Sequence, residues 1–141
     1  MTENTVKSGT MKTQTKNNLL NALHAEAFAY VKYMLFAERA RKNGRSDLAD
    51  LFESTAKVER FEHFAEEAAL AGLVNSDEEN LQDAITGESF EVDIMYGDFT
   101  QQARNMGDQD VADRFGEIRR DERGHRDLFK AAAAHLSDPI A

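Results

Sequence analysis

Apolar residues recur at intervals of three and four positions along almost the whole chain, and this helical spacing is what most constrains the fold. The spacing begins near Thr13, after a polar and aperiodic segment, residues 1–12, that we expect to form an N-terminal tail. It is interrupted at Gly44, Gly72 and Gly107, where glycine can end a helix. The sequence therefore predicts an all-α domain over residues 13–137, a four-helix bundle made of two antiparallel helix hairpins.

The connection between the two hairpins is predicted to be long. Ser76 and Glu79 have the spacing of a capping box and should start a helical stretch. Gly87 lies inside that stretch, so we expect the third helix to have its main body after this residue. A connection of roughly fifteen residues can run the length of a bundle and place the third helix parallel to the second.

Composition excludes several classes of function. The net charge of −9 argues against a nucleic-acid partner, which needs a basic surface. No apolar run is long enough for a membrane span and the first residues lack a signal-peptide core, so we expect a cytoplasmic protein. Cysteine is absent, so any metal must be bound by oxygen and nitrogen ligands, which suit iron, manganese or zinc.

Acidic residues occupy positions of the helices that should face the core. In the first helix Glu26 continues the apolar stripe of Leu19, Leu23, Tyr30 and Tyr33. The other three helices repeat this anomaly with Glu59 and Glu62, with Glu88 and Glu91, and with Glu122 and His125. Counted from the turns at Gly44 and Gly107, all seven side chains lie 15 to 19 residues away. At about 1.5 Å rise per residue, they should meet in one layer of the bundle.

Six carboxylates in one interior layer require cations, because an unpaired buried charge costs several kcal/mol. Helical bundles hold two metal ions with glutamates and Glu-x-x-His units, and residues 122–125 form such a unit. Any one of these residues alone would be ordinary: a lone glutamate usually faces solvent, and Tyr30, Tyr33 and Tyr96 would usually be packing residues. Their alignment favours a dimetal site. Other charged residues are expected to face water, namely Glu66, Glu67, His24, His135 and the run Asp77, Glu78, Glu79.

The segments that carry these residues resemble a known family. They are Asn18-Leu-Leu-Asn-Ala-Leu-His-Ala-Glu26, Phe52-Glu-Ser-Thr-Ala through Glu59, Gly87-Glu88-Ser-Phe-Glu91 with Met95-Tyr96, and Phe115 through Glu122-Arg-Gly-His125. Over about residues 16 to 135 they look like the ferritin-like diiron domain of rubrerythrins. The resemblance implies a ferritin-like four-helix bundle, two iron ions, reduction of hydrogen peroxide to water, and a homodimer.

The resemblance also implies a role for each residue. Glu26 and Glu88 would be terminal ligands, Glu59 and Glu122 bridging ligands, and His125 a nitrogen ligand. Glu91 would bind or release iron as the oxidation state changes. Tyr33 and Tyr96 resemble tyrosines that hydrogen-bond to ligands.

The sequence departs from the family pattern in two places. A second Glu-x-x-His unit would place histidine at position 62, but Glu62 stands there and the histidine is His63. A slip of one residue rotates a helical side chain by roughly 100°, so we expect Glu62 to be the ligand unless the helix contains a π-bulge. The rubredoxin-like domain with its four cysteines is also missing from these residues. Electrons would then come from a separate donor, such as a rubredoxin or a flavoprotein.

Three functions are compatible with this pattern. The first is a diiron peroxidase that reduces hydrogen peroxide, or dioxygen, with Glu91 or Glu62 relaying protons. The second is a ferroxidase that oxidises iron(II) and stores it, as ferritins do. The third is a structural or regulatory bundle in which zinc or manganese neutralises the acids.

Overall fold

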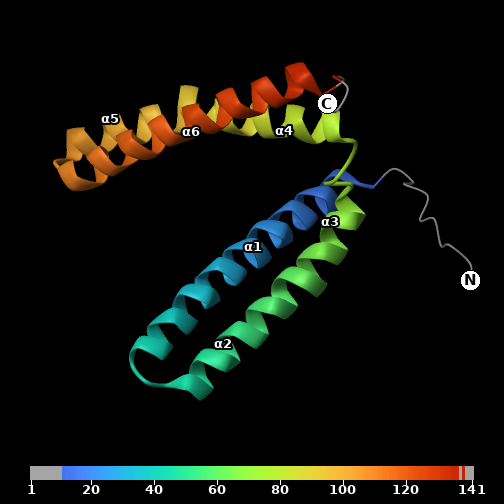
Figure 1. The fold of residues 1–141 in the computed structure, drawn as a ribbon, viewed down its shortest axis with the longest axis vertical. Helices are drawn as coiled ribbons and strands as arrows, with labels where there is room; N and C mark the ends of the chain where they lie inside the picture. Colours follow the sequence, from blue (N-terminus) through green and yellow to red (C-terminus); the bar gives the residue numbers. More distant parts are fainter. Residues whose placement is uncertain (1–10, 137, 139–141) are drawn as a thin grey trace, which may run out of the picture. The chain divides into compact units, whose positions relative to one another are not determined.

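The computed structural model describes residues 11–136 and residue 138, and within them the structure is helical with no strand. The first hairpin pairs α1 (Thr13–Lys42) with a second rod made of α2 (Ser46–Val58), η1 (Glu59–Phe64) and α3 (Ala65–Ala71). The second pairs a rod made of α4 (Asp77–Phe90), η2 (Glu91–Met95) and α5 (Tyr96–Met106) with α6 (Gln109–His135). The predicted all-α fold and its two antiparallel hairpins are confirmed (Figure 1). Most of the expected tail, residues 1–10, lies outside the described residues, as does residue 137 at the expected end of the domain.

One rod of each hairpin contains a π-helical turn. The backbone remains in the right-handed helical region at Glu59, Ala65, Glu91 and Tyr96, so η1 and η2 are insertions in continuous rods rather than breaks. In η2 the Tyr96 N–H donates to the Glu91 carbonyl, five residues earlier, which is the hydrogen-bond pattern of a π-helix. Such turns insert one extra residue and change which side chains share a face.

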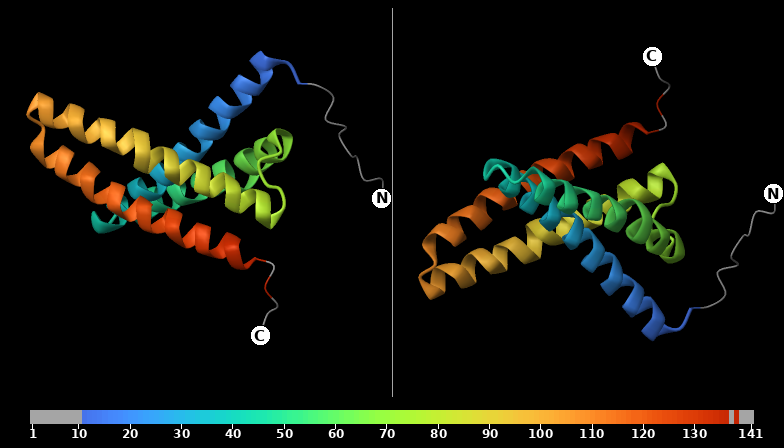
Figure 2. Two further views of the ribbon diagram at one scale, coloured as in Figure 1. Left: turned by 90° about the horizontal axis from the view of Figure 1, so that it is seen from above. Right: turned by 90° about the horizontal axis from the view of Figure 1, so that it is seen from below.

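Alanines line the seam of the first hairpin. Its two rods lie side by side in Figures 1 and 2, and the residues buried between them are Leu23, Ala37, Ala40, Ala49, Ala56 and Ala68. Small side chains allow two helices to approach closely over a long distance. The rings of Tyr33, Phe36 and Phe52 fill the wider space near the turn, with centroids 5.4 to 6.3 Å apart.

The second hairpin repeats this construction. Val92, Ala103 and Ala112 are buried along its seam, where α6 follows α4 and α5 (Figure 2). The rings of Tyr96, Phe99 and Phe115 lie with their centroids 5.8 to 6.4 Å apart. Each hairpin thus has a seam of small buried residues along its rods and an aromatic cluster near its turn.

The connection between the hairpins is shorter than predicted. Ser76 and Glu79 form the expected capping box, and α4 begins directly at Asp77 and continues through Gly87 without a break. Only residues 72–76 remain outside the helices. Five extended residues span less than about 20 Å, and a rod of 30 residues such as α1 is about 45 Å long, so this connection does not run the length of a hairpin. The chain divides into two compact units between Val74 and Asn75, one hairpin in each.

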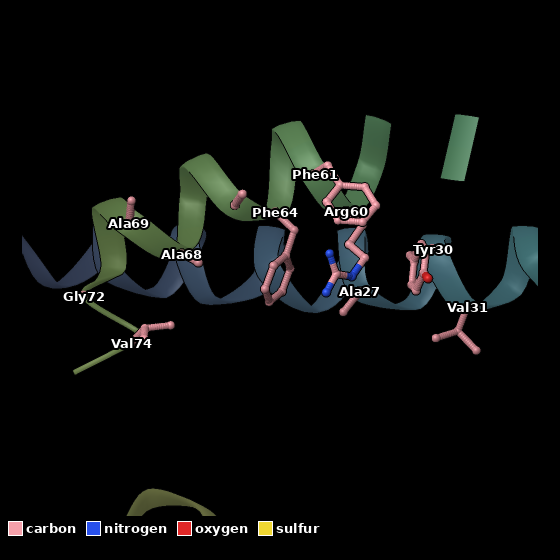
Figure 3. Close-up of a pocket in the computed structure, with 11 residues that line it drawn as sticks. Ala27, Tyr30, Val31, Arg60, Phe61, Phe64, Ala68, Ala69, Gly72 and Val74 are labelled. Carbon is pink, nitrogen blue, oxygen red and sulfur yellow. The ribbon is translucent and has the colours of Figure 1, made fainter. Parts of the chain in front are cut away.

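Each hairpin leaves large apolar side chains exposed. Examples are Phe28 at 69% and Phe61 at 61% exposure in the first unit, and Leu128 at 70% in the second. In the first unit an apolar groove of 660 Å³ runs along α1, η1 and α3, and Figure 3 shows Phe64 and Arg60 extending from η1 toward α1. A two-helix unit with such a face needs a partner surface to cover it. None of the described helices is long and apolar enough to cross a bilayer.

Replacement of Gly72 tests whether a left-handed residue ends the second rod. Gly72 has φ +62° and space for a β-carbon, so Gly72→Ala should reduce the free energy of unfolding by about 1 kcal/mol through backbone strain alone. Gly87→Ala is the matched control, because Gly87 is helical and also has open space around it. Urea unfolding should show that the control gains about 0.5 to 1 kcal/mol. Equal effects of the two substitutions would contradict this account.

Candidate metal centre

The first hairpin brings together two carboxylates and one imidazole. Glu26 projects from α1, and Glu59 and His63 project from η1. Nδ1 of His63 lies 3.2 Å from Oε2 of Glu59 and 3.7 Å from Oε2 of Glu26. Each residue offers one ligand atom, and all of these atoms lie within 4.8 Å of one another. This group, Glu26, Glu59 and His63, is half-site 1.

The π-helical turn explains why His63 rather than Glu62 joins half-site 1. In a regular α-helix the residues three and four positions after Glu59, Glu62 and His63, would both lie near its face. The wider turn of η1 rotates Glu62 away and leaves His63 beside Glu59. Glu62 is exposed and is not part of the group. The structure therefore brings His63, and not the expected Glu62, together with Glu26 and Glu59.

The second hairpin carries a matching group. Glu88 projects from α4, and Glu122 and His125 project from α6. Nδ1 of His125 lies 2.8 Å from Oε2 of Glu122 and 3.8 Å from Oε1 of Glu88. Here the helix is regular, and the expected spacing of three residues holds. Glu88, Glu122 and His125 form half-site 2.

Three other predicted site residues, Glu91, Tyr96 and Tyr33, are not members of the two half-sites. Glu91 is the first residue of η2. Burial is the main cause of its raised pKa, and the negative charge of the nearby Glu122 is the second cause. Burial, followed by the charges of Glu91 and Glu122, raises the pKa of Tyr96. Tyr33 lies in the aromatic cluster of the first hairpin, with its ring against Phe36 and Phe52.

Neighbouring carboxylates shift each other's pKa within each half-site. The adjacent Glu59, with which Glu26 can share a proton, is the largest cause of the raised pKa of Glu26, followed by burial. The pKa of Glu59 is lowered by the same interaction and by His63. In half-site 2, burial and then Glu122 raise the pKa of Glu88, and the pKa of Glu122 is lowered by Glu88 and His125. Two carboxylates side by side cannot both ionise easily, and a cation removes that conflict.

The carboxylates also shift the pKa values of the two histidines. The hydrogen bond to Glu59 is the main cause of the raised pKa of His63, and the bond to Glu122 raises the pKa of His125. A proton on each imidazole thus compensates the neighbouring carboxylates. The same carboxylates would surround a metal ion if that proton were lost.

The donor atoms fit a metal ion of intermediate hardness. Oε2 of Glu26 and Oε2 of Glu88 are buried and accept no hydrogen bond within the described residues, although buried carboxylate oxygens normally have a partner. One imidazole nitrogen and two carboxylates in each half-site suit iron, manganese or zinc. A metal ion would complete the coordination of these unpartnered oxygens.

One acid near half-site 1 was assigned to solvent on sequence grounds. Glu67 is half-buried, its Oε2 accepts no hydrogen bond within the described residues, and its charge contributes to the raised pKa of Glu26. It lies one turn beyond the π-helical insertion, which shifts the helical phase of every later residue. Glu66, His24 and His135 are exposed, as expected.

The fold and the two half-sites define a class of protein: an all-helical protein with paired carboxylate and histidine groups for metal binding. A family model described as rubrerythrin matches residues 17–133. The chain therefore belongs to the rubrerythrin family, and its helices belong to the ferritin-like fold class expected from the sequence.

Two curated rubrerythrins agree with this assignment. The chain is 33% identical over 137 residues to a rubrerythrin of Porphyromonas gingivalis, an alignment that covers 89% of the chain and 68% of that protein. It is 30% identical over 138 residues to a rubrerythrin of Nitratidesulfovibrio vulgaris, covering 89% and 72%. A solved structure of fully reduced, all-ferrous nigerythrin aligns at 29% identity with a TM-score of 0.47, covering 96% of the chain and 74% of that structure.

The shifted pKa values predict that the metal-free protein loses stability as the pH rises. The stability that protonated His63 and His125 contribute is fully present below 6.5 and is lost as the pH rises through their raised pKa values. Because the pKa values of Glu26, Glu88 and Glu91 are raised, ionisation of these carboxyls also lowers the stability as the pH rises above 4.5. Urea unfolding of the metal-free protein at about pH 5.5, 7 and 8.5 should show a steady decline.

The lowered pKa values of Glu59 and Glu122 set the acid limit of this behaviour. Their contribution to stability is present above 4.5 and is lost as the pH falls through the lowered values, so a second decline is expected at strongly acidic pH. Stability that is constant or increases between about pH 5.5 and 8.5 would contradict the assignment of these protons.

Proposed function

We propose that the two half-sites together hold a pair of iron ions, and that the protein reduces hydrogen peroxide to water with electrons from a separate donor. The observation that supports this proposal is the repetition of one constellation, two carboxylates and one imidazole with an unpartnered buried oxygen, in both hairpins. Helical bundles hold dinuclear iron with ligands of this kind. The hairpins that supply them come from the same chain or from two chains of a dimer.

The proposed ligands are the six residues of the half-sites together with Glu91. In this proposal Glu26 and Glu88 would be terminal ligands, Glu59 and Glu122 would be the carboxylates shared by the two ions, and His63 and His125 would be nitrogen ligands. His63 replaces Glu62 in this set because it lies beside Glu59 and Glu26. Glu91 is the exchangeable carboxylate, since it lies near Glu122 but outside the three-residue group of half-site 2.

Iron, when bound, supplies the two electrons that cleave the O–O bond of peroxide, and two protons complete the two water molecules. Glu91 is the proposed proton carrier, because burial and the charge of Glu122 raise its pKa and favour its protonated form. Tyr96 lies near Glu91 and Glu122 and keeps its hydroxyl proton at neutral pH, since its pKa is raised. Its hydroxyl can therefore donate a hydrogen bond to a ligand carboxylate or to the substrate. Tyr33 is proposed for the same role in the first hairpin.

The electrons are proposed to come from another protein. The 141 residues contain no cysteine, so they supply no thiolate ligands for a rubredoxin-type iron centre. A rubredoxin or a flavoprotein would dock on the surface and reduce the site. We also propose a homodimer, because the apolar faces around Phe28 and Phe61 need a covering surface.

The choice between His63 and Glu62 can be tested with two adjacent substitutions. His63→Ala removes the only imidazole of half-site 1 and should weaken binding of the first two iron(II) ions per site at least about tenfold. Glu62→Ala is the matched control and should bind iron(II) like the unmodified protein, because Glu62 is exposed. Anaerobic titration followed by calorimetry measures both. The opposite order of effects would return Glu62 to the ligand set.

Peroxide reduction can be tested by stopped-flow absorption. The anaerobic iron(II) protein should be oxidised by one equivalent of peroxide per two irons, and much faster than by dioxygen. Glu59→Ala removes a proposed bridging ligand and should slow this oxidation by about 100-fold or more. Equal and slow oxidation of both proteins would reject a peroxidase.

The iron(II)-loaded protein also distinguishes a peroxidase from a ferroxidase that stores iron. A ferroxidase and storage protein would react preferentially with dioxygen and accumulate many more than two irons per site in a large hollow assembly. Gel filtration with an iron count would show this. A small dimer with two irons per site supports the peroxidase instead.

A further inference from the structure

Two arginines of α6 hold the π-helical turn η2, and neither has a role in the chemistry proposed above. Nε of Arg119 donates to the Val92 carbonyl oxygen at 2.6 Å. Nη1 of Arg126 donates to both carboxylate oxygens of Asp93, at 3.2 and 3.1 Å. The arginines lie three residues before and four residues after Glu122, so all three side chains share one face of α6.

The contact of Arg119 compensates for a hydrogen bond that the π-helix displaces. In an α-helix the Val92 carbonyl would accept from the Tyr96 N–H, four residues later. In η2 the Tyr96 N–H donates to the Glu91 carbonyl instead. Val92 is 1% exposed, so water has little access to its carbonyl. The guanidinium of Arg119 supplies a donor from the opposite rod of the hairpin.

Gly97 makes room for this guanidinium. A β-carbon at position 97 would lie 3.3 Å from both Cζ and Nη2 of Arg119, closer than such contacts normally are. By contrast, a β-carbon at Gly116, on the same hairpin, would meet no atom within 4 Å. The lack of a side chain at Gly97 therefore leaves space for Arg119, whereas a side chain at Gly116 would contact nothing.

The other π-helical turn has no equivalent support. Within the described residues no side chain donates to a backbone carbonyl of η1, whose histidine instead bonds to Glu59. The guanidinium of Arg60 stacks on Phe61, 4.2 Å from the ring centroid. The two turns are stabilised differently although each accompanies one half-site.

We propose that Arg119, admitted by Gly97 and assisted by Arg126, is a positioning residue that locks η2 in its π-helical register. This lock sets the orientation of Glu91, at the first position of η2, relative to Glu122. Without it, η2 relaxes toward α-helical hydrogen bonding, and every residue from Glu91 toward Tyr96 turns relative to α6. The consequence for metal binding rests on the proposed function, but the lock itself does not.

Hydrogen exchange on the metal-free, full-length protein tests the lock. Gly97→Ala crowds the guanidinium of Arg119 without a change of charge, and Arg119→Met removes the Nε donor while keeping a long side chain. Both should accelerate amide exchange in the peptide spanning residues 91–98 by about tenfold or more. Gly116→Ala is the matched control and Arg119→Lys the conservative rescue, since its ammonium can reach the same carbonyl. Both should stay within about threefold of the unmodified protein.

Cobalt(II) binding then connects the lock to the site. Its visible absorption reports the number and geometry of ligands, so Gly97→Ala and Arg119→Met should change this spectrum while Gly116→Ala does not. Exchange in residues 91–98 that is unaffected by both Gly97→Ala and Arg119→Met would overturn the proposal. Failure of the unmodified protein to bind cobalt(II) would instead reject the proposed metal centre and leave the lock intact.

Discussion

The crowding of carboxylates at half-buried positions is the constraint on which the rest of the structure depends. Glu26 beside Glu59, and Glu88 beside Glu122, each place two acids so close that the pKa of one of them is raised. An amphipathic helix gains stability by burying its apolar face, so acids on that face cost free energy in the absence of cations. The alanine seams bring the rods close enough for the acids to meet. Each hairpin also leaves large apolar side chains exposed.

The two hairpins are variations of one unit. Glu59 and Glu122 each lie 15 residues after the turn glycine, and Phe52 and Phe115 each lie seven residues before those glutamates. The differences are the two π-helical insertions. One gives His63 a spacing of four from Glu59, where His125 has a spacing of three from Glu122. The other puts Tyr96 eight residues after Glu88, where Tyr33 is seven after Glu26. Each insertion adjusts one half-site without altering its turn.

Helical periodicity predicted the rods and their turns at Gly44, Gly72 and Gly107, and it placed Glu26 level with Glu59, and Glu88 level with Glu122 and His125, which the structure groups. These features depend on local spacing and are visible in one chain. The prediction differs from the structure where hydrogen bonding departs from the α-helical pattern, because Glu62 was preferred on a constant 3.6 residues per turn and His63 only if the helix contained a π-bulge. That assumption favoured Glu62 over His63 and placed Glu67 in solvent. A histidine displaced by one position from its expected place was the available signal of the bulge. Gly87 was given too much weight against the Ser76 capping box, which is why the connection was predicted to be long.

The central claim is that two metal ions lie among the carboxylates and imidazoles of these half-sites. Crystals of the iron-loaded protein measured at the iron absorption edge test it most directly, because anomalous scattering locates the ions independently of any activity. The account predicts two peaks about 3.5 to 4 Å apart, one bound by His63 with Glu26 and the other by His125 with Glu88, and bridged by Glu59 and Glu122. A map with no anomalous peak among these six side chains, or with iron bound only at other acids of the surface, would contradict it.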